Sequence, residues 1–151
     1  MAISNKEVIE MLTKSYCMEL ETVINYLQSS INPDGVRAEE IKKSLGADIT
    51  AELGHAQQIG QRIKQLGGTL PGSLALEFDQ KSLQPAEKST DLVSVIKAVI
   101  DAEEGAIAQY KKIIKAVEGE DYVTQDLCIK LLADEEEHLV LFKGFLKEYA
   151  S

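Results

Sequence analysis

Four glutamates lie on the apolar stripes of four helical segments, and this pattern constrains the fold more than any other feature of the chain. Apolar residues recurring at three- and four-residue intervals predict these helices. The helices span about residues 4–31, 36–66, 91–117 and 121–149. The four stripe glutamates are Glu19, Glu52, Glu103 and Glu135. On the first helix the predicted stripe consists of Val8, Leu12, Tyr16, Val23 and Leu27. Because a buried carboxylate is costly without a partner or a metal, the helices must bring these side chains to one shared centre.

Local signals mark where the predicted helices begin and end. Ser4 and Glu7 have the spacing of a capping box, and Asp121 can cap the last helix. Gly67 follows the second helix, as a glycine beyond the last turn often does. Periodicity then fades over residues 69–90, which predicts a long crossover between the second and third helices. The sequence therefore predicts one all-α domain over residues 1–151, an up-down-down-up four-helix bundle.

Each of the chain's 2 histidines stands three residues after a stripe glutamate. The two motifs are ELGH at 52–55 and EEEH at 135–138. Residues three apart share a helix face, so each histidine faces the same centre as its glutamate. Carboxylates with imidazoles suit a pair of first-row transition ions, iron or manganese, better than calcium or magnesium.

This ligand pattern assigns a role to each of the six side chains. One glutamate from each of two helices plus a Glu-x-x-His motif from each of two others is the pattern of di-iron carboxylate bundles. We expect Glu52 and Glu135 to bridge the two ions, as carboxylates do between ions roughly 3.5–4 Å apart. Glu19 and Glu103 are the terminal ligands. His55 and His138 bind one ion each.

A weak internal repeat relates the two halves of the chain. Tyr26 follows Glu19 by seven residues, and Tyr110 follows Glu103 by seven. Each half therefore reads as one helical hairpin with the same set of ligands. The tyrosines either pack in the core with a bonded hydroxyl or hydrogen bond to a ligand carboxylate.

Four segments resemble those of bacterioferritin and its relatives in the ferritin-like di-iron superfamily. They are ELETVINY (19–26), ELGHAQQIGQRIKQLGG (52–68), EEGAIAQY (103–110) and DEEEHLVLF (134–142). The resemblance spans all four helices, and the paired Glu-x-x-His motifs are its specific part. It implies a ferritin-like bundle that oxidises Fe(II) with dioxygen or hydrogen peroxide. It also implies storage of the ferric iron as a mineral inside a hollow shell.

Two departures from bacterioferritin modify these expectations. Leu53 stands where bacterioferritins carry the methionine that binds haem, so we expect no haem of that kind. Only 13 residues follow His138, which leaves little room for the fifth helix of 24-subunit ferritins. We therefore expect a dodecamer or a dimer, nearest to the bacterioferritin-like dodecameric mini-ferritins, with a complete metal site in each chain.

The composition narrows the partners and the compartment. A net charge of −9 opposes binding to nucleic acid or to anionic membranes and attracts Fe(II). The N-terminal residues lack an apolar run of secretory length, and no segment is long enough to span a membrane. Cys17 and Cys128 lie in predicted helices outside any CxxC motif, which favours a cytoplasmic protein with buried thiols. A redox pair between them stays open.

Other functions are compatible with the same ligands. A rubrerythrin-like peroxidase would need a separate electron donor, and a di-iron oxygenase would need an apolar pocket beside the metals. A metal-bearing scaffold without turnover is a fourth possibility. Glu104, Glu136 and Glu137 adjoin the ligands but are expected in solvent, and Glu21 faces away from the stripe. The amount of iron retained per chain separates storage from the other three functions.

Overall fold

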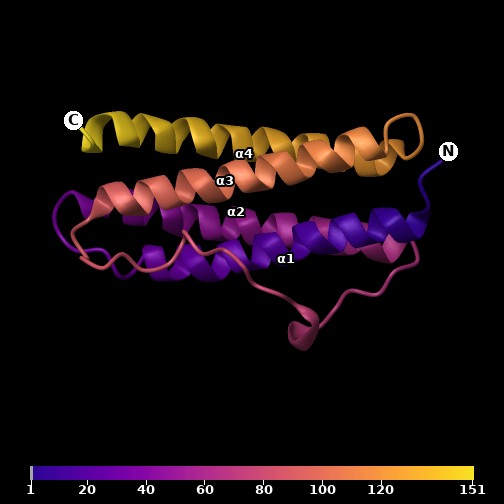
Figure 1. The fold of residues 1–151 in the computed structure, drawn as a ribbon, viewed down its shortest axis with the longest axis horizontal. Helices are drawn as coiled ribbons and strands as arrows, with labels where there is room; N and C mark the ends of the chain where they lie inside the picture. The colour runs from indigo at the N-terminus through magenta and orange to yellow at the C-terminus, as the bar shows by residue number, and fades with distance from the viewer. Residues whose placement is uncertain (1) are drawn as a thin grey trace.

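The computed structural model describes residues 2–151, and its four long helices form a bundle (Figure 1). The helices are α1 (Asn5–Ser29), α2 (Ala38–Gln65), α3 (Leu92–Ala116) and α4 (Tyr122–Tyr149). α1 and α2 form one antiparallel hairpin, and α3 and α4 form the other. The crossover returns along the length of the bundle, so α2 and α3 run in the same direction (Figure 1). The predicted all-α, up-down-down-up topology is thus confirmed.

The capping residues predicted from the sequence lie at the ends of the helices and make the expected hydrogen bonds. The Ser4 hydroxyl accepts a hydrogen bond from the Glu7 backbone N–H at 3.2 Å, and the full capping box is present. The Asp121 carboxylate accepts one from the Thr124 N–H at 3.0 Å. Gly67 has φ of 89°, and the N–H groups of Leu66, Gly67 and Gly68 donate to carbonyl oxygens in the last turn of α2. α1 ends and α2 begins two residues inside the predicted bounds, because the intervening turn extends to residue 37.

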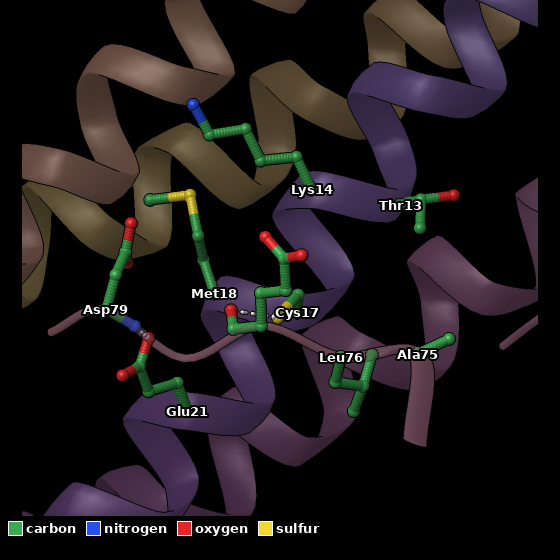
Figure 2. A pocket seen from close by; sticks show the side chains of 9 residues that line it. Thr13, Lys14, Cys17, Met18, Glu21, Ala75, Leu76 and Asp79 are labelled. Carbon is green, nitrogen blue, oxygen red and sulfur yellow. Dashed lines mark hydrogen bonds between the residues drawn. The ribbon is translucent and has the colours of Figure 1, made fainter. Parts of the chain in front are cut away.

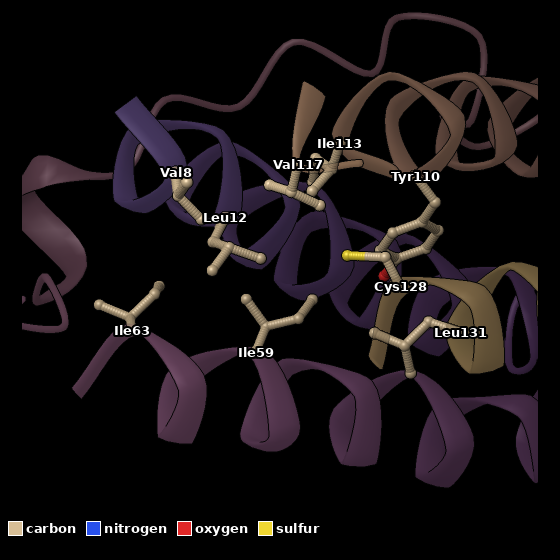
Figure 3. Close-up of a cluster of buried hydrophobic side chains, with 9 residues drawn as sticks. All are labelled: Val8, Leu12, Ile59, Ile63, Tyr110, Ile113, Val117, Cys128 and Leu131. Carbon is tan, nitrogen blue, oxygen red and sulfur yellow. The ribbon is translucent and has the colours of Figure 1, made fainter. Parts of the chain in front are cut away.

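Two apolar clusters fill the bundle, one on each side of its middle. The first lies toward the N-terminal end of α1 (Figure 3) and contains Val8, Leu12, Ile59, Ile63, Tyr110, Ile113, Val117, Cys128 and Leu131. The second contains Tyr26, Ile41, Leu45, Leu83, Val95, Ile96, Ala98, Val99 and Phe142. All four helices contribute to both clusters. The bundle is therefore packed independently at its two ends.

The crossover packs along the outer side of α1 and includes a short 3₁₀ helix, η1 (Ser73–Ala75), that the sequence pattern did not predict. The Glu21 carboxylate accepts hydrogen bonds from the backbone N–H groups of Asp79 at 3.0 Å and Gln80 at 2.7 Å. This contact buries Glu21, whose exposed fraction is 5%. Beside it, α1 and the crossover enclose a surface pocket of about 290 Å³ (Figure 2). Glu21 thus fastens the crossover to α1.

One residue of the predicted apolar stripe on α1 does not reach the core. Leu27 is 51% exposed, whereas Tyr26 is fully buried. At about 100° per residue, seven positions from Glu19 return to within about 20° of its direction, but eight positions overshoot it by about 80°. Leu27 instead joins Ile24 and Ile31 in an exposed apolar strip. Within residues 2–151, no helix combines the length and apolarity needed to cross a bilayer.

The two cysteines have different surroundings and are both free. The Cys17 thiol donates to the Glu77 carbonyl oxygen at 3.0 Å on the crossover side of α1. Cys128 is buried beside Tyr110 in the first apolar cluster (Figure 3). Burial raises the pKa of Cys128 to about 12, which makes its thiol unreactive. These positions favour a structural role for Cys128 over a redox pair with Cys17.

Candidate metal centre

The six candidate ligands meet in the middle of the bundle, between the two apolar clusters. On α1, Glu19 lies between Leu12 of the first cluster and Tyr26 of the second. The other three glutamates have the same placement on their helices, and all four are at most 2% exposed. His55 is equally buried, whereas the side chain of His138 is 15% exposed.

Two groups of ligand atoms can be distinguished, one around each histidine. The His55 Nδ1 atom lies 2.9 Å from Glu135 Oε1, 3.6 Å from Glu19 Oε2 and 3.7 Å from Glu52 Oε2. The four residues each offer one ligand atom, all within 4.8 Å of one another. We call this group the His55 position.

The second group repeats this arrangement around the other histidine. The His138 Nδ1 atom lies 3.4 Å from Glu52 Oε1, 3.7 Å from Glu103 Oε1 and 3.9 Å from Glu135 Oε2. These four residues also offer ligand atoms within 4.8 Å of one another. We call this group the His138 position.

Two glutamates belong to both positions and divide their oxygens between them. Glu52 directs Oε2 to His55 and Oε1 to His138. Glu135 directs Oε1 to His55 and Oε2 to His138. Glu19 is grouped with the His55 position alone and Glu103 with the His138 position alone. This division is the geometry expected of two bridging and two terminal carboxylates.

Each of the six side chains has one buried polar atom without a hydrogen-bond partner. These atoms are Glu19 Oε2, Glu52 Oε1, His55 Nδ1, Glu103 Oε2, Glu135 Oε1 and His138 Nδ1. An unsatisfied buried polar group costs about 1–3 kcal/mol, so six of them in one place are unfavourable unless something binds there. Oxygen and imidazole donors together suit iron or manganese. The residues present therefore fit a pair of such ions.

The two repeat-related tyrosines contact the terminal glutamates reciprocally across the bundle. The Tyr26 hydroxyl on α1 donates to Glu103 Oε1 on α3. The Tyr110 hydroxyl on α3 donates to Glu19 Oε1 on α1, at 2.5 Å. In both glutamates the other oxygen is the one left without a partner. In Glu19 the free oxygen is the one that lies 3.6 Å from His55 Nδ1, whereas Glu103 Oε1 both accepts from Tyr26 and lies 3.7 Å from His138 Nδ1. Each tyrosine thus holds one terminal carboxylate in place beside a histidine.

Two aspartates beside the histidines were missed in the sequence. Asp134 Oδ2 lies 2.9 Å from His55 Nε2, and Asp48 Oδ1 lies 3.4 Å from His138 Nε2. Asp48 stands one helical turn before Glu52, and Asp134 directly precedes Glu135. The turn spacing of Asp48 was a usable signal, because four residues place it on the face of Glu52. Asp134 is half-exposed and carries no such signal.

Burial and mutual repulsion keep protons on the centre when no metal is bound. Burial raises the pKa of Glu135 to about 12, and burial with repulsion from Glu52 raises the pKa of Glu19 well above its ordinary value. Burial alone would lower the pKa of both histidines. The close carboxylates of the surrounding glutamates reverse this effect, so the pKa of His55 is raised and that of His138 reaches about 10.

Metal affinity should therefore rise with pH. Glu135 and His138 hold protons at neutral pH without metal, and the raised pKa values of Glu19 and His55 make these two groups hold protons more firmly than usual. Ligands bind metal in the deprotonated form, so binding releases protons and is favoured as pH increases. We expect the logarithm of the Mn(II) association constant to increase with a slope of about two or more between pH 6 and 8. Calorimetric titrations in buffers of different ionisation enthalpy measure the proton release, and a pH-independent affinity would contradict this proton inventory.

The bundle and its buried glutamate and histidine clusters define a class, the diiron-carboxylate four-helix proteins. Within this class the chain belongs to the family described as "Ferritin-like domain", which it matches over residues 9–150. The resemblance to bacterioferritin and its relatives is thereby confirmed, and it extends over nearly the whole chain.

Individual relatives support the same assignment. The chain is 27% identical to the DNA protection during starvation protein of Pyrococcus furiosus over 146 residues, which cover 95% of this chain and 79% of that protein. It is 25% identical to the bacterioferritin of Desulfovibrio desulfuricans over 139 residues, covering 91% and 73%. A dodecameric thioferritin, the bacterioferritin-related protein of Bacteroides fragilis, superposes with a TM-score of 0.83 at 24% identity, covering 98% and 89%. This last likeness concerns the fold alone.

Proposed function

We propose that this protein is a ferroxidase that oxidises Fe(II) for iron storage or detoxification. The observation that carries the proposal is the division of oxygens at the centre, where Glu52 and Glu135 each face both histidine positions. Membership of the ferritin-like family and the bacterioferritin relative support it. Manganese would fit the same donors, so iron is part of the proposal.

In the proposed reaction Fe(II) is the substrate and the side chains act as its binding site. Two Fe(II) ions give up one electron each, and dioxygen takes two electrons and two protons to become hydrogen peroxide. When hydrogen peroxide is the oxidant, it takes the two electrons and two protons and becomes two water molecules. The four carboxylates offset the charge of two divalent ions, and the apolar clusters on both sides exclude bulk water. No organic substrate is needed.

The tyrosines should affect how well the centre binds metal. In Tyr110→Phe, Glu19 Oε1 loses its hydrogen bond and its carboxylate is no longer held in orientation. We expect Mn(II) affinity to fall about 10-fold, the lower range for loss of a group that orients a metal ligand. Tyr26→Phe should behave alike through Glu103.

The matched control is Tyr149→Phe. In the unmodified protein the Tyr149 hydroxyl donates to the Arg37 carbonyl oxygen, away from the centre. This variant should bind Mn(II) as the unmodified protein does. Equal affinities in all three tyrosine variants would show that the reciprocal hydrogen bonds do not support the ligands.

We also propose a homo-oligomer, with a dodecamer favoured over a dimer. The thioferritin of Bacteroides fragilis is a dodecamer. The strip of Ile24, Leu27 and Ile31 offers exposed apolar surface on α1 for contact with another subunit. Leu53 has no sulfur to offer a haem iron, so no haem is included. The net charge of −9 and the two free thiols favour a cytoplasmic protein that does not bind nucleic acid.

The test is to add Fe(II) aerobically to the metal-free protein and to count the iron retained per chain, with the assembled mass measured on the same sample. We expect hundreds of irons per assembly in a particle of twelve chains. Two irons per chain in a small oligomer would exclude storage and favour a peroxidase or an oxygenase. No retained iron and no oxidation would exclude the metal assignment.

A further inference from the structure

The middle of the crossover, residues 71–82, lies on the bundle without packing into it. None of these residues is buried. Leu74 is fully exposed and Phe78 is half-exposed, although both side chains are large and apolar. The apolar anchors stand at the two ends of the segment, where Leu70 lies against α2 and Leu83 is buried in the second apolar cluster. A segment that is held at both ends and unburied between them can open while the helices stay packed.

We propose that residues 71–82 form a lid over the seam between α1 and α3, and that this lid opens to admit hydrogen peroxide to the metal centre. Opening means that the segment moves away from α1 between its two anchors. The inference rests on the proposed function and adds to it the route of one of the two oxidants. In that reaction two Fe(II) ions give one electron each to hydrogen peroxide, which takes two protons and becomes two water molecules.

Hydrogen bonds hold the lid on α1. The Glu21 carboxylate accepts from the backbone N–H groups of Asp79 and Gln80 at 3.0 and 2.7 Å, and Figure 2 shows the first of these contacts. The Gln80 side chain donates to Thr22 Oγ1 at 2.7 Å and accepts from Asn25 Nδ2 at 2.8 Å. Water can replace each of these partners when the lid lifts, so each bond contributes only about 0.5–1.5 kcal/mol to closure. The lid is therefore weakly held compared with the packed helices.

The lid spans the two helices that carry the terminal glutamates. Besides its contacts with α1, its Ser82 hydroxyl donates to Asp101 Oδ2 on α3 at 2.5 Å. Asp101 precedes Glu103 by two residues. On α1, Thr22 follows Glu19 by three residues and so lies on the same helix face, about one turn away. Opening the lid thus uncovers the seam beside the terminal ligands.

The side chains beneath the lid suit a small neutral molecule that forms hydrogen bonds. Thr22 and Asn25 are buried there, and they offer a hydroxyl and an amide. Hydrogen peroxide can donate to and accept from such groups as water does. An Fe(II) ion would exchange part of its hydration shell for neutral groups, which is unfavourable, and the partly exposed His138 gives ions another side of the centre. Dioxygen forms no hydrogen bonds of this kind, so the lid should select for peroxide.

Hydrogen exchange of the metal-free protein tests the opening of the lid without any reaction. Corrected for intrinsic rates, the N–H groups of Asp79 and Gln80 should exchange about 100-fold or more faster than those in the middle of α1. Gln80→Ala removes two side-chain hydrogen bonds and should speed exchange at Asp79 by about a further 10-fold. The matched control is Gln58→Ala, at an exposed position on α2, which should leave the exchange of the lid unchanged.

A reversible disulfide tests the route. The Cys17 Sγ atom lies 3.0 Å from the Glu77 backbone oxygen, so Glu77→Cys places a second thiol beside the first. Diamide takes one hydrogen from each thiol and is reduced to a hydrazine, while the two sulfurs join and tie the lid to α1. Mass spectrometry verifies the bond. The control is Glu77→Ser, which diamide cannot close in this way.

With hydrogen peroxide as oxidant and without dioxygen, the closed Glu77→Cys protein should oxidise Fe(II) about 10-fold or more slowly than the same protein after reduction. With dioxygen the two forms should react alike, and they should bind Mn(II) with equal affinity. Thr22→Val removes the hydroxyl beneath the lid at similar volume, and it should slow the peroxide reaction alone without needing a disulfide. Diamide should not change the rates of Glu77→Ser.

Exchange at Asp79 and Gln80 as slow as in the middle of α1 would overturn the lid itself. Fast exchange with equal peroxide rates in the closed and reduced forms, or with equal slowing for both oxidants, would overturn the selective route. Neither result would affect the metal centre. Absence of Fe(II) oxidation by either oxidant in the unmodified protein would instead exclude the proposed function, and the entry route with it, whereas the exchange result would still decide whether the lid opens.

Discussion

Replacing Glu135 with glutamine should lower the initial rate of aerobic Fe(II) oxidation by a factor on the order of 100 or more. Glu135 offers one oxygen to the His55 position and the other to the His138 position, so the change affects both ions. A neutral amide is a weaker ligand for a hard cation than a carboxylate. Loss of groups that only orient a ligand costs about 10- to 100-fold, and loss of a bridging ligand should exceed that range. The absorbance of ferric iron measures the rate.

The matched control for this variant is Glu136→Gln. Glu136 is the next residue on α4, but its side chain is exposed to solvent. The Glu136→Gln variant should oxidise Fe(II) at the unmodified rate, because it makes the same chemical replacement at a residue that does not touch the centre.

The metal-free Glu135→Gln variant should also fold normally. Burial raises the pKa of Glu135 to about 12, so this side chain is already neutral at pH 7 and glutamine resembles it in charge and shape. In the unfolded chain the carboxyl is ionised at pH 7, so keeping it protonated in the folded state opposes folding. The variant should therefore be at least as stable as the unmodified protein without metal. A folded variant with an unchanged oxidation rate would refute the bridging role.

The second large effect is a rise in melting temperature when the centre is filled. A ligand that binds only the folded state stabilises it by about 4 kcal/mol at a concentration 1,000 times its dissociation constant. For a chain of this size, 1 kcal/mol corresponds to about 2–4 °C. Saturating Mn(II) without oxygen should thus raise the melting temperature by about 10 °C for one ion, and further for two. Differential scanning calorimetry with and without a chelator measures the shift.

Variants that each lack one ligand show how much of the rise in melting temperature comes from each of the two metal positions. Glu19→Gln removes a ligand from the His55 position, and Glu103→Gln removes one from the His138 position. Each should keep roughly half of the stabilisation. Glu104→Gln, at the exposed residue next to Glu103, should keep all of it. A shift of equal size in all of these proteins would mean that Mn(II) binds elsewhere.

The helices and the meeting of the six side chains could be predicted because both depend on local periodicity. Glu19 and Glu103 lie on apolar stripes, and each Glu-x-x-His motif places two donors on one helix face. Capping side chains mark where α1, α3 and α4 begin, whereas α2 begins without one, and the predicted bounds agree with the structure to within about two residues.

Features that depend on contacts between distant segments could not be predicted in the same way. Asp134 meets His55 only because of the register between α2 and α4, which no single helix encodes. Glu21 is buried by the backbone of a crossover whose path lacks periodicity. Leu27 was wrongly predicted to be buried because two steps of four residues were counted from Glu19. The helix returns to the face of Glu19 after seven residues, at Tyr26, and not after eight.

The apolar clusters on either side of the ligands affect how often the metal centre can be filled and emptied. Every helix is anchored above and below its glutamate, so the backbone of the centre is held in place whether or not ions are present. We expect ions to arrive and depart by rotation of side chains, without the slower collective motion that opening the bundle would require. Such a centre can fill and empty many times during the life of one molecule, as a transit point for iron must.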